Sequence, residues 1–394
     1  MLKKMSSIIL TLILLFDIVY ASEVDLESER FILYNLNDNQ VLMSEKENEE
    51  VSIASLTKIM TVIVSIEKIN DFNDKVIITD EMIDNIEWDV SKIGFKEGEE
   101  YTYNDLLYGS ILASGADAVN ALAISTYGSY DKFINAMNEK AASLNMNHTR
   151  YSNVVGLYDE NNYSSAYDQA KLLMYALNND KFKEVFETKQ YTLTSGKKIK
   201  STMESYNTKN NDDISYILGS KTGYINDAGY CLASIASLNG VNYLFISLNA
   251  YSDDYTVHIK DHIKTYNYFN DNYGYKDLVN FDDIVGSINV KYSIEKKYDI
   301  KSPINIQKYL KNDYDKSKVS IEYIGKDNIT YFTKKGTNLG IIKVSYDNNP
   351  LAYFDVIYND GLTFDSFEYV RENGIYIIVS ILVILLIVGV KKEV

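Results

Sequence analysis

A chain of 394 residues has room for two domains, and 46% hydrophobic residues are enough for a substantial core. The formal net charge of −16 argues against a nucleic-acid partner, because phosphate binding requires clustered lysine and arginine side chains. The single cysteine, Cys231, excludes an internal disulfide, and its place in a strand pattern predicts a small core side chain.

The first residues have the pattern of a secretory signal peptide. Lys3 and Lys4 precede an apolar run over residues 8–16, and Val19-Tyr20-Ala21 fits a small-residue cleavage site. An uncleaved anchor is the alternative, but an apolar run this short spans a bilayer poorly. We therefore expect residues 1–21 to be a signal peptide and most of the chain to lie outside the cell membrane.

The next segment predicts a hairpin followed by a buried helix. Residues 31–43 alternate between apolar and polar side chains around Asn37-Asp38-Asn39, which is typical of an edge hairpin. Residues 53–69 are apolar nearly all round, so they predict a central helix inside a core, with Ser52 as its candidate N-cap.

Capping residues and apolar spacing indicate further helices. Thr102 and Asp105 form a capping box for a helix that ends near Ile111. Ser114-Gly115 then interrupts the apolar pattern. The helices expected after this break cover residues 117–125, a segment that starts at Ser129, and a segment capped by Ser165 with Asp168 that ends near Leu177.

A sheet region follows and completes an α+β domain that ends near residue 275. Strands are predicted over residues 216–224, 229–238 and 241–250. Asn239-Gly240 is a strong signal for a two-residue hairpin between the last two strands. Ser252 is expected to cap a final helix, with apolar residues at Ile259, Ile263, Tyr266 and Phe269.

The C-terminal part of the chain has a different character. Short alternating runs separated by Asp, Asn and Gly turns predict a small all-β domain over residues 276–366. An uncharged run then leads to Lys391-Lys392. We therefore expect a transmembrane anchor over residues 373–390 and a cytoplasmic tail at 391–394. A buried core helix is the alternative, but the uniform apolarity and terminal position argue against it.

Ser55 and Lys58 lie three residues apart at the start of the predicted central helix. This spacing puts a hydroxyl and an amine on one helix face, one turn apart. A neutral lysine can take the serine proton, so the serine can attack a carbonyl without a histidine. Burial lowers a lysine pKa, and a nearby cation, for which Lys221 is the candidate, lowers it further. The backbone amide of Ser55 is a candidate oxyanion donor.

Lys221-Thr222-Gly223 lies far downstream, in the first predicted strand of the sheet region. A cation beside a hydroxyl donor suits a carboxylate. Gly223 has no side chain, so the strand can approach a bound peptide and add it as an extra strand. The backbone amide of Tyr224 is a second candidate oxyanion donor. Ser114, at a break between helices, can present its hydroxyl to the same cleft and relay a proton.

Each of these residues also has a purely structural interpretation. Ser55 can be an ordinary residue at a helix N-terminus, Lys58 a solvated side chain, and Ser114 part of a helix kink. Lys221-Thr222-Gly223 can be an ordinary strand end. The presence of all these motifs in this order favours the functional interpretation. It is also favoured because a lysine side chain on so apolar a helix can hardly reach water.

In these motifs the chain resembles the serine-type D-alanyl-D-alanine carboxypeptidases, the low-molecular-mass penicillin-binding proteins of peptidase family S11. The β-rich domain and the membrane helix also look like that family's second domain and anchor. The segments that carry the resemblance are Ile53-Ala-Ser-Leu-Thr-Lys-Ile-Met-Thr61, Gly98-Glu-Glu-Tyr-Thr-Tyr-Asn-Asp-Leu-Leu-Tyr-Gly109, Ser114-Gly-Ala-Asp-Ala-Val-Asn-Ala-Leu-Ala123, 149–157, Ser164-Ser-Ala-Tyr-Asp168, Gly219-Ser-Lys-Thr-Gly-Tyr224 and Ala228-Gly-Tyr-Cys-Leu232.

The resemblance implies a fold and a set of residue roles. The fold is α+β: a β-lactamase/transpeptidase-like catalytic domain over residues 22–275, a small C-terminal all-β domain and a single C-terminal transmembrane helix. Ser55 is implied as the acylated nucleophile, Lys58 as the general base and Ser114 as the proton shuttle. Lys221 and Thr222 would bind the substrate's terminal carboxylate. The implied substrate-binding residues are Lys221, Thr222, Gly223 and Tyr224.

The implied reaction removes the last D-alanine from peptidoglycan stem pentapeptides, through an acyl-enzyme that water hydrolyses, and thereby adjusts cell-wall cross-linking. β-Lactams would trap the same serine. The implied location is the extracytoplasmic face of the cell membrane, with a single-pass C-terminal anchor. Neither a cofactor nor a metal is expected.

Two departures from the family pattern stand out. The second motif of the family usually reads Ser-Gly-Asn, whereas the third position here is Ala116, and Asn120, one helical turn on, is a candidate substitute. Many relatives have arginine three residues before the aspartate that matches Asp261, whereas this chain has His258. We expect a weaker or pH-dependent carboxylate contact there. His258 and His262 have the spacing of a metal pair, but no third ligand stands nearby.

Other functions remain open from the sequence. A β-lactamase shares the serine–lysine chemistry, but the glutamate motif that drives fast deacylation is missing, and such a secreted hydrolase does not need the β-rich domain and anchor. A D,D-endopeptidase would use the same chemistry on a cross-linked peptide. A catalytically weak or silent wall-binding protein is supported by Ala116 alone.

Overall fold

The computed structural model describes residues 24–390 except residues 85, 88, 89, 211 and 360. The described chain forms two compact units, which meet in sequence between Asp271 and Asn272. The predicted signal peptide and cytoplasmic tail lie outside the described residues.

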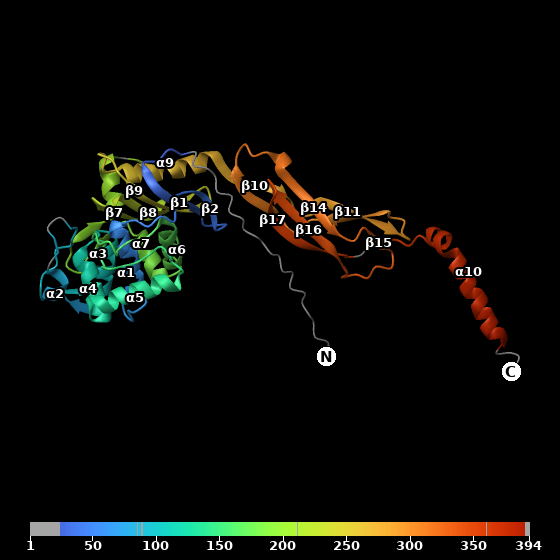
Figure 1. Ribbon diagram of the computed structural model, residues 1–394, viewed down its shortest axis with the longest axis horizontal. Coiled ribbons are helices and arrows are strands. Elements are labelled where there is room, and N and C mark those ends of the chain that lie inside the picture. The colour runs from blue at the N-terminus through green and yellow to red at the C-terminus, as the bar shows by residue number, and fades with distance from the viewer. Residues whose placement is uncertain (1–23, 85, 88–89, 211, 360, 391–394) are drawn as a thin grey trace. The chain divides into compact units, whose positions relative to one another are not determined.

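A five-stranded antiparallel sheet is the frame of the first unit (Figure 1), with the order β2-β1-β9-β8-β7. Phe31 in the first strand pairs with Ser247 in the last strand. The strands from the beginning and the end of the unit therefore belong to one sheet. The hairpin predicted near residues 31–43 and the three later strands are confirmed. The strands are β1 (Ser28–Asn35), β2 (Gln40–Glu45), β7 (Ile217–Ile225), β8 (Gly229–Leu238) and β9 (Val241–Ala250).

Helices cover both faces of this sheet (Figure 1). On one face, Leu244 and Ile246 of β9 join a core with the helix α1. On the other face lies α9, whose His262 contacts Ser234 and Ser247. The helices are α1 (Thr57–Ile66), α3 (Tyr103–Ile111), α4 (Ala116–Tyr127), α5 (Tyr130–Ser143), α6 (Ala166–Ala176), α7 (Asp180–Glu187) and α9 (Val257–Asn272).

The predicted central helix is confirmed, because every residue of α1 is buried. Its start differs from the prediction: the 3-10 turn η1 (Ala54–Leu56) precedes α1. Ser52 is not its cap, since Leu56 occupies that position and the buried Ser52 hydroxyl has no hydrogen-bond partner among the described residues. The chain enters the helix through a tight turn, which leaves Ser52 outside capping reach.

Three of the other predicted caps are confirmed. Thr102 and Asp105 form the capping box of α3. The side chains of Ser129 and Ser165 accept hydrogen bonds from the first turns of α5 and α6. The cap predicted at Ser252 is wrong, because α9 begins only at Val257 and the Ser252 hydroxyl accepts from the Asp254 amide in a local turn.

Smaller elements complete the first unit. They lie between the main helices and were not predicted. They are β3 (Lys75–Ile77) paired with β4 (Glu100–Thr102), β5 (Gln190–Thr192) paired with β6 (Lys198–Lys200), and the helices α2 (Asp80–Ile83) and α8 (Thr202–Asn210). Cys231 of β8 has no exposed surface, which confirms it as a core side chain.

The second unit is rich in strands. Two three-stranded sheets, β12-β11-β15 and β14-β16-β17, contribute side chains to one hydrophobic core, and β10 pairs with β13. Its strands are β10 (Tyr273–Val279), β11 (Ile284–Lys291), β12 (Lys297–Lys301), β13 (Ile306–Lys311), β14 (Val319–Gly325), β15 (Asn328–Thr330), β16 (Asn338–Tyr346) and β17 (Asn349–Ile357), with a 3-10 turn η2 (Lys316–Lys318).

The long helix α10 (Ser366–Val390) ends the described chain. Its segment Ser366–Val388 is long and apolar enough to cross a membrane, and none of its most apolar window is buried. The helix is thus a candidate membrane span, and it begins several residues before the predicted start at residue 373.

Candidate active site

The Ser55 hydroxyl and the Lys58 amine are in direct contact. Lys58 Nζ donates to Ser55 Oγ at 2.7 Å and to the backbone carbonyl of Val155 at 2.7 Å. The lysine is 2% exposed, whereas Ser55 is half-buried and keeps part of its surface exposed. The fold therefore joins a reachable hydroxyl to a buried amine, and it does so through η1 and the first turn of α1.

Burial changes the proton affinity of both cleft lysines. It lowers the pKa of Lys58 from 10.5 to about 7, so a large fraction of this amine is neutral near neutral pH. The expected help from Lys221 is not needed for this shift. Burial, and then the charge of Lys58, lower the pKa of Lys221 well below 10.5. Two cations this deeply buried and this close are disfavoured together.

Ser114 belongs to a second serine–lysine pair. Lys221 Nζ donates to Ser114 Oγ at 3.0 Å and to the backbone carbonyl of Thr222 at 2.6 Å. Ser114 sits between α3 and α4, and Lys221 is in the middle of β7 with 1% of its surface exposed. The structure thus brings together residues 107 positions apart in sequence.

Unusual backbone geometry occurs at both serine motifs. Ala54, directly before Ser55, has a φ of 46°, and Ser114 itself has a φ of 55°. Non-glycine residues rarely adopt this left-handed conformation, and it costs free energy of the order of 1 kcal/mol or more. Such geometry is concentrated at functional sites, because it aims a side chain in a direction that regular structure does not allow.

Gly223 lets β7 lie directly against the Ser55 turn. A Cβ atom built on Gly223 would lie 2.9 Å from Ser55 N and 3.1 Å from Ala54 Cβ. The sequence had suggested a close approach to a bound peptide, whereas the close neighbour in the structure is the protein's own backbone. A side chain here would therefore separate the strand from the serine.

β7 lies at the edge of the sheet, and two residues of its Lys221–Tyr224 motif keep exposed surface. β7 is the last strand in the order of the sheet, so one of its backbone edges is open to an added strand. Thr222 is half-buried, and Tyr224 is 52% exposed with its ring against Tyr230 at 4.4 Å. An extended peptide beside β7 would therefore pass both residues.

The loop over residues 153–157 holds the carbonyl that contacts Lys58. Asn153 Oδ1 accepts hydrogen bonds from the amides of Val155, Gly156 and Leu157. Thr61 of α1 donates to the carbonyl of Val154 at 2.8 Å. The Val155 carbonyl is therefore presented to Lys58 by a loop that is tied both to itself and to α1.

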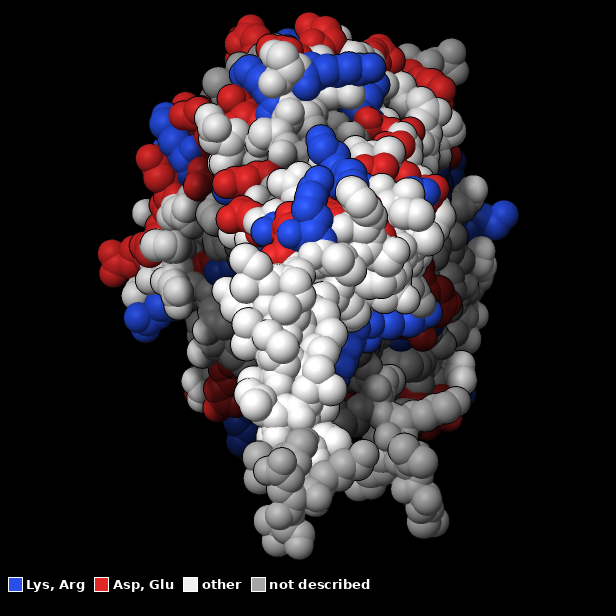
Figure 2. Space-filling view, turned by 90° about the vertical axis from the view of Figure 1, so that its right-hand side faces the viewer, with Lys and Arg blue, Asp and Glu red and all other residues white. Residues whose placement is uncertain are grey.

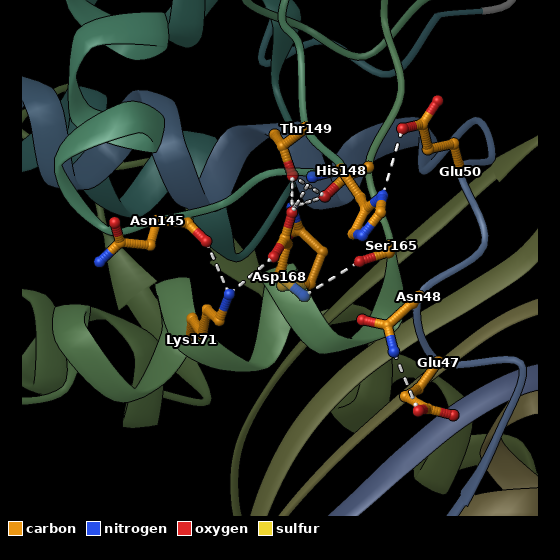
Figure 3. Close-up of polar contacts among 11 residues, drawn as sticks. Glu47, Asn48, Glu50, Asn145, His148, Thr149, Ser165, Asp168 and Lys171 are labelled. Atoms are coloured by element: carbon orange, nitrogen blue, oxygen red, sulfur yellow. Dashed lines mark hydrogen bonds and ion pairs between the residues drawn. The ribbon is translucent and has the colours of Figure 1, made fainter.

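A buried carboxylate, that of Asp168, holds the segment that leads to this loop (Figure 3). Asp168 in the first turn of α6 accepts from the His148 amide at 2.7 Å, from Thr149 Oγ1 at 2.9 Å and from Lys171 Nζ at 3.2 Å. Asp168 is completely buried, and its own amide donates to Ser165. The sequence resemblance included Asp168 without assigning it this supporting position.

Ala116 and Asn120 line a pocket of about 620 Å³ together with Val155. The buried Ala116 donates its amide to the Ser91 carbonyl at 2.8 Å. Among the described residues, neither Lys58 nor Ser114 hydrogen-bonds to Asn120. The suggested substitution of Asn120 for the missing amide therefore stays a prediction about a contact with substrate.

His258 is a buried, neutral ring and not a cation. Its ring stacks on Tyr230 at 5.1 Å, and burial lowers its pKa from 6.5 to about 4. Among the described residues, Asp261 accepts hydrogen bonds from the amide and hydroxyl of Ser28 and not from this ring. His262 lies between the hydroxyls of Ser234 and Ser247. In the described part of the chain no group of three metal-ligand side chains is close enough to hold an ion.

Solved structures place this architecture among the penicillin-binding proteins. Penicillin binding protein 5 from Haemophilus influenzae is similar with a TM-score of 0.63 and 21% identity, over 87% of this chain and 100% of that one. The Streptomyces K15 DD-transpeptidase is similar with a TM-score of 0.56 and 26% identity, over 63% of this chain and 98% of that one. The fold is thus the α+β fold expected from the sequence.

The family follows from a direct sequence match. A family model described as peptidase S11, D-alanyl-D-alanine carboxypeptidase, matches residues 18–252. The chain belongs to this family. A D-alanyl-D-alanine carboxypeptidase of Bacillus subtilis, DacF, is 30% identical over 58% of this chain and 59% of its own length. A D-alanyl-D-alanine endopeptidase of Haemophilus influenzae is 32% identical over 53% of this chain and 70% of its own length.

Proposed function

We propose that this protein removes the terminal D-alanine from peptidoglycan stem pentapeptides through a serine acyl-enzyme. Ser55 Oγ attacks the carbonyl carbon of the penultimate D-alanine while neutral Lys58 takes the hydroxyl proton. The amide bond breaks, the leaving amine gains a proton through Ser114, and D-alanine departs. Water then hydrolyses the ester and restores the Ser55 hydroxyl. Neither a metal nor a cofactor takes part in these steps.

The proposed substrate site lies along β7. Lys221 and Thr222 bind the terminal carboxylate of the peptide, because an amine and a hydroxyl offer it two donors. An arriving carboxylate favours the protonated form of Lys221, which opposes the effect of burial on the pKa of that amine. The amides of Ser55 and Tyr224 stabilise the negative oxygen that develops during attack. Gly223 keeps the strand close enough to Ser55 for both to act together.

One observation supports this proposal above the others: the Ser55 hydroxyl lies 2.7 Å from a buried lysine whose pKa is lowered to about 7. A solvated lysine would be protonated and could not act as a base. The family match is independent support, since it rests on sequence and not on geometry.

The direct test is D-alanine release from a synthetic pentapeptide by the purified chain. Ser55→Ala should abolish release, whereas Ser125→Ala should leave it unchanged. Ser125 is a suitable control, because its hydroxyl bonds back to the carbonyls of Ala121 and Leu122 within α4. Release by Ser55→Ala at the wild-type rate would show that another group is the nucleophile.

Endopeptidase activity on cross-linked peptides is the second candidate. It is favoured by relatives in Haemophilus influenzae and Escherichia coli that are named D-alanyl-D-alanine endopeptidases. Both activities use the same serine chemistry, so only the substrate separates them. Faster cleavage of a cross-linked dimer than of a monomeric pentapeptide would favour the endopeptidase.

A fluorescent penicillin separates the remaining alternatives. Stable labelling supports a carboxypeptidase or endopeptidase, rapid turnover of the label indicates a β-lactamase, and absence of labelling indicates a silent wall-binding protein. We expect stable labelling, because the site contains a reachable serine with its base.

We also propose a location and a division into domains. The catalytic domain (22–275) and the β-rich domain (276–366) would lie on the extracytoplasmic face, held by a single-pass anchor over residues 373–390. The candidate span in α10 supports the anchor. The orientation is the one expected from the sequence pattern of a signal peptide over residues 1–21 and from the lysines at 391 and 392.

A further inference from the structure

Five aromatic side chains gather where α10 leaves the β-rich unit, and we call them the aromatic collar. Tyr292 follows β11, and Tyr331 and Phe332 follow β15. Phe364 lies two residues before α10, and Tyr369 lies in its first turn. The Tyr369 ring lies 5.1 Å from Tyr292, 5.5 Å from Phe332 and 5.7 Å from Phe364. Tyr331 lies 5.1 Å from Phe364, so the five rings form one group.

This group is poorly covered by the rest of the described chain. Phe332 is 56% exposed, and Tyr331 and Phe364 are each 38% exposed. Phe367 and Val370, on the first turns of the helix, are 78% and 55% exposed. Contiguous exposed apolar surface of this kind marks a contact with another phase or partner.

Hydrogen bonds and ion pairs hold the start of α10 against the β-rich unit. Lys296 Nζ donates to Asp365 at 3.1 Å and to Glu368 at 3.0 Å. Glu368 also accepts from the Tyr292 amide at 2.8 Å, and Glu295 accepts from the amide and hydroxyl of Thr363. These bonds hold the β-rich unit and the start of α10 together, so the placement of the helix in a membrane also sets where this unit lies.

The length of the apolar run determines how deep the collar lies. At 1.5 Å per residue, the uncharged residues 375–390 cover about 24 Å, which is about 6 Å less than a typical hydrocarbon core. Residues 371–374 must then lie at the edge of that core, or the bilayer must become thinner. Either way Tyr369, only a few residues earlier, lies in the interfacial layer, where tyrosine rings are enriched.

We propose that the aromatic collar is a bilayer-seating surface: together with the first turns of α10 it enters the outer interfacial layer of the membrane and holds the β-rich unit on the lipid. This inference rests on the proposed anchor in α10. Uncharged side chains cover the helix, while charged ones gather where it meets the β-rich unit (Figure 2). The exposed Lys334 and Lys335 come two and three residues after Phe332 and are placed to meet anionic headgroups.

The test measures the contact of a single tryptophan with lipid. The chain has one natural tryptophan, Trp88, so Trp88→Phe provides a silent background. The full chain carrying Phe332→Trp is reconstituted in phosphatidylcholine–phosphatidylglycerol vesicles in which some lipids are brominated near the headgroup end of the acyl chain. We expect a blue shift of the emission and quenching by the brominated lipid. Phe364→Trp is a second reporter in case the first variant folds poorly.

The matched control is Phe281→Trp. Phe281 belongs to the same unit and is 65% exposed, but it precedes β11, whereas Tyr292 follows that strand. The 8 residues of β11 separate the two ends by about 26 Å. Phe281→Trp should therefore show no quenching. Equal quenching of both reporters would overturn a seating surface confined to the collar.

Flotation of the same vesicles distinguishes a failure of the proposed anchor from a failure of the proposed seating surface. A full chain that does not float with the vesicles overturns both the anchor and the seating surface. A chain that floats while neither collar reporter is quenched overturns the seating surface alone. A blue shift that depends on protein concentration and not on vesicles would show that a second copy covers the collar, and it would also overturn the proposal. D-Alanine release, measured on the same samples, reports on the catalytic proposal independently.

Discussion

At the scale of single residues, the account depends on the protonation state of Lys58. The amine lies deep in the first unit with two acceptors, a serine hydroxyl and a backbone carbonyl. Desolvation is what lowers its pKa to about 7. A lysine in this state can take a proton during attack and return it later, which neither a solvated lysine nor an arginine can do near neutral pH.

This protonation state predicts the pH dependence of the reaction. Only neutral Lys58 accepts the serine proton, and the amine becomes neutral as the pH rises through its pKa. The value of kcat/KM for D-alanine release should therefore rise about tenfold between pH 6 and pH 8, with a midpoint near 7. His258→Gln should leave the midpoint in place, because that ring, with a pKa of about 4, is already neutral. A flat profile of the wild-type enzyme over this range would contradict the role of Lys58.

Ala116 allows a second residue-scale prediction. The second motif of the family that the chain resembles usually has an asparagine here. Its amide can hydrogen-bond a substrate backbone, and a hydrogen bond of this kind contributes about 1 kcal/mol. Ala116→Asn should therefore raise kcat/KM for a pentapeptide by about fivefold. Steady-state kinetics with the wild-type chain alongside is the measurement. An unchanged or lower value would mean that the cleft has adapted to alanine.

At the scale of elements, the parts that could be predicted are those with a local cause. Thr102 with Asp105, Ser129 and Ser165 cap helices through bonds to residues three positions away. Asn239-Gly240 joins β8 to β9 by a turn that needs residues able to adopt positive φ. Two predicted caps were wrong for different reasons. At Ser52 a tight 3-10 turn precedes the helix, and Ser252 instead bonds within a local turn.

The part of the site that could not be predicted from the sequence depends on contacts between segments that are distant in the chain. The Val155 carbonyl, 97 residues from Lys58, is a backbone atom, so no side chain in the sequence marks it. The left-handed Ala54 and Ser114 have no local signal either, because their conformation is imposed by the packing around them. The contact between the Ser55 and Lys58 side chains could be predicted from their spacing in the sequence. The loop whose carbonyl orients Lys58 could not be predicted.

The loop over residues 153–157 can be tested through Gly156. This glycine has a φ of +89°, and a Cβ atom built on it would lie 1.9 Å from the Ala54 carbonyl oxygen. Gly156→Ala should push the loop away from the Ser55 turn, lower the free energy of unfolding by about 1–3 kcal/mol, and reduce D-alanine release more than tenfold. Urea denaturation and kinetics measure the two effects.

Gly196→Ala is the matched control for this experiment. Gly196 has nearly the same backbone conformation, with a φ of +85°, but a Cβ atom built on it would have no described atom within 4 Å. Its substitution should cost only the backbone strain, about 1 kcal/mol, and leave release unchanged. If the two variants lost the same activity, close packing at Gly156 would not support the site.

At the scale of the whole molecule, the chain combines a catalytic unit with a β-rich unit that ends in an apolar helix. All the proposed catalytic groups come from the first unit, between Ser55 and Tyr224. The candidate membrane span belongs to the second unit. Chemistry and attachment to the membrane are therefore expected to be separable.

Removal of residues 366–394 tests this separation. The shortened chain should no longer float with vesicles, because the candidate span is gone. It should release D-alanine from a soluble pentapeptide at a rate within about twofold of the full chain in detergent, because no proposed catalytic group is removed. Flotation and kinetics on the two chains measure this. Persistent flotation of the shortened chain would place the membrane contact elsewhere.

The central claim is that Ser55 is acylated with Lys58 as its base, and the most direct measurement is the mass of the penicillin-treated protein followed by peptide mapping. We predict one penicilloyl group per chain, on the peptide that contains Ser55, and acylation at least about a hundredfold slower in Lys58→Met. An adduct on a different residue, or acylation of Lys58→Met at the wild-type rate, would contradict the account.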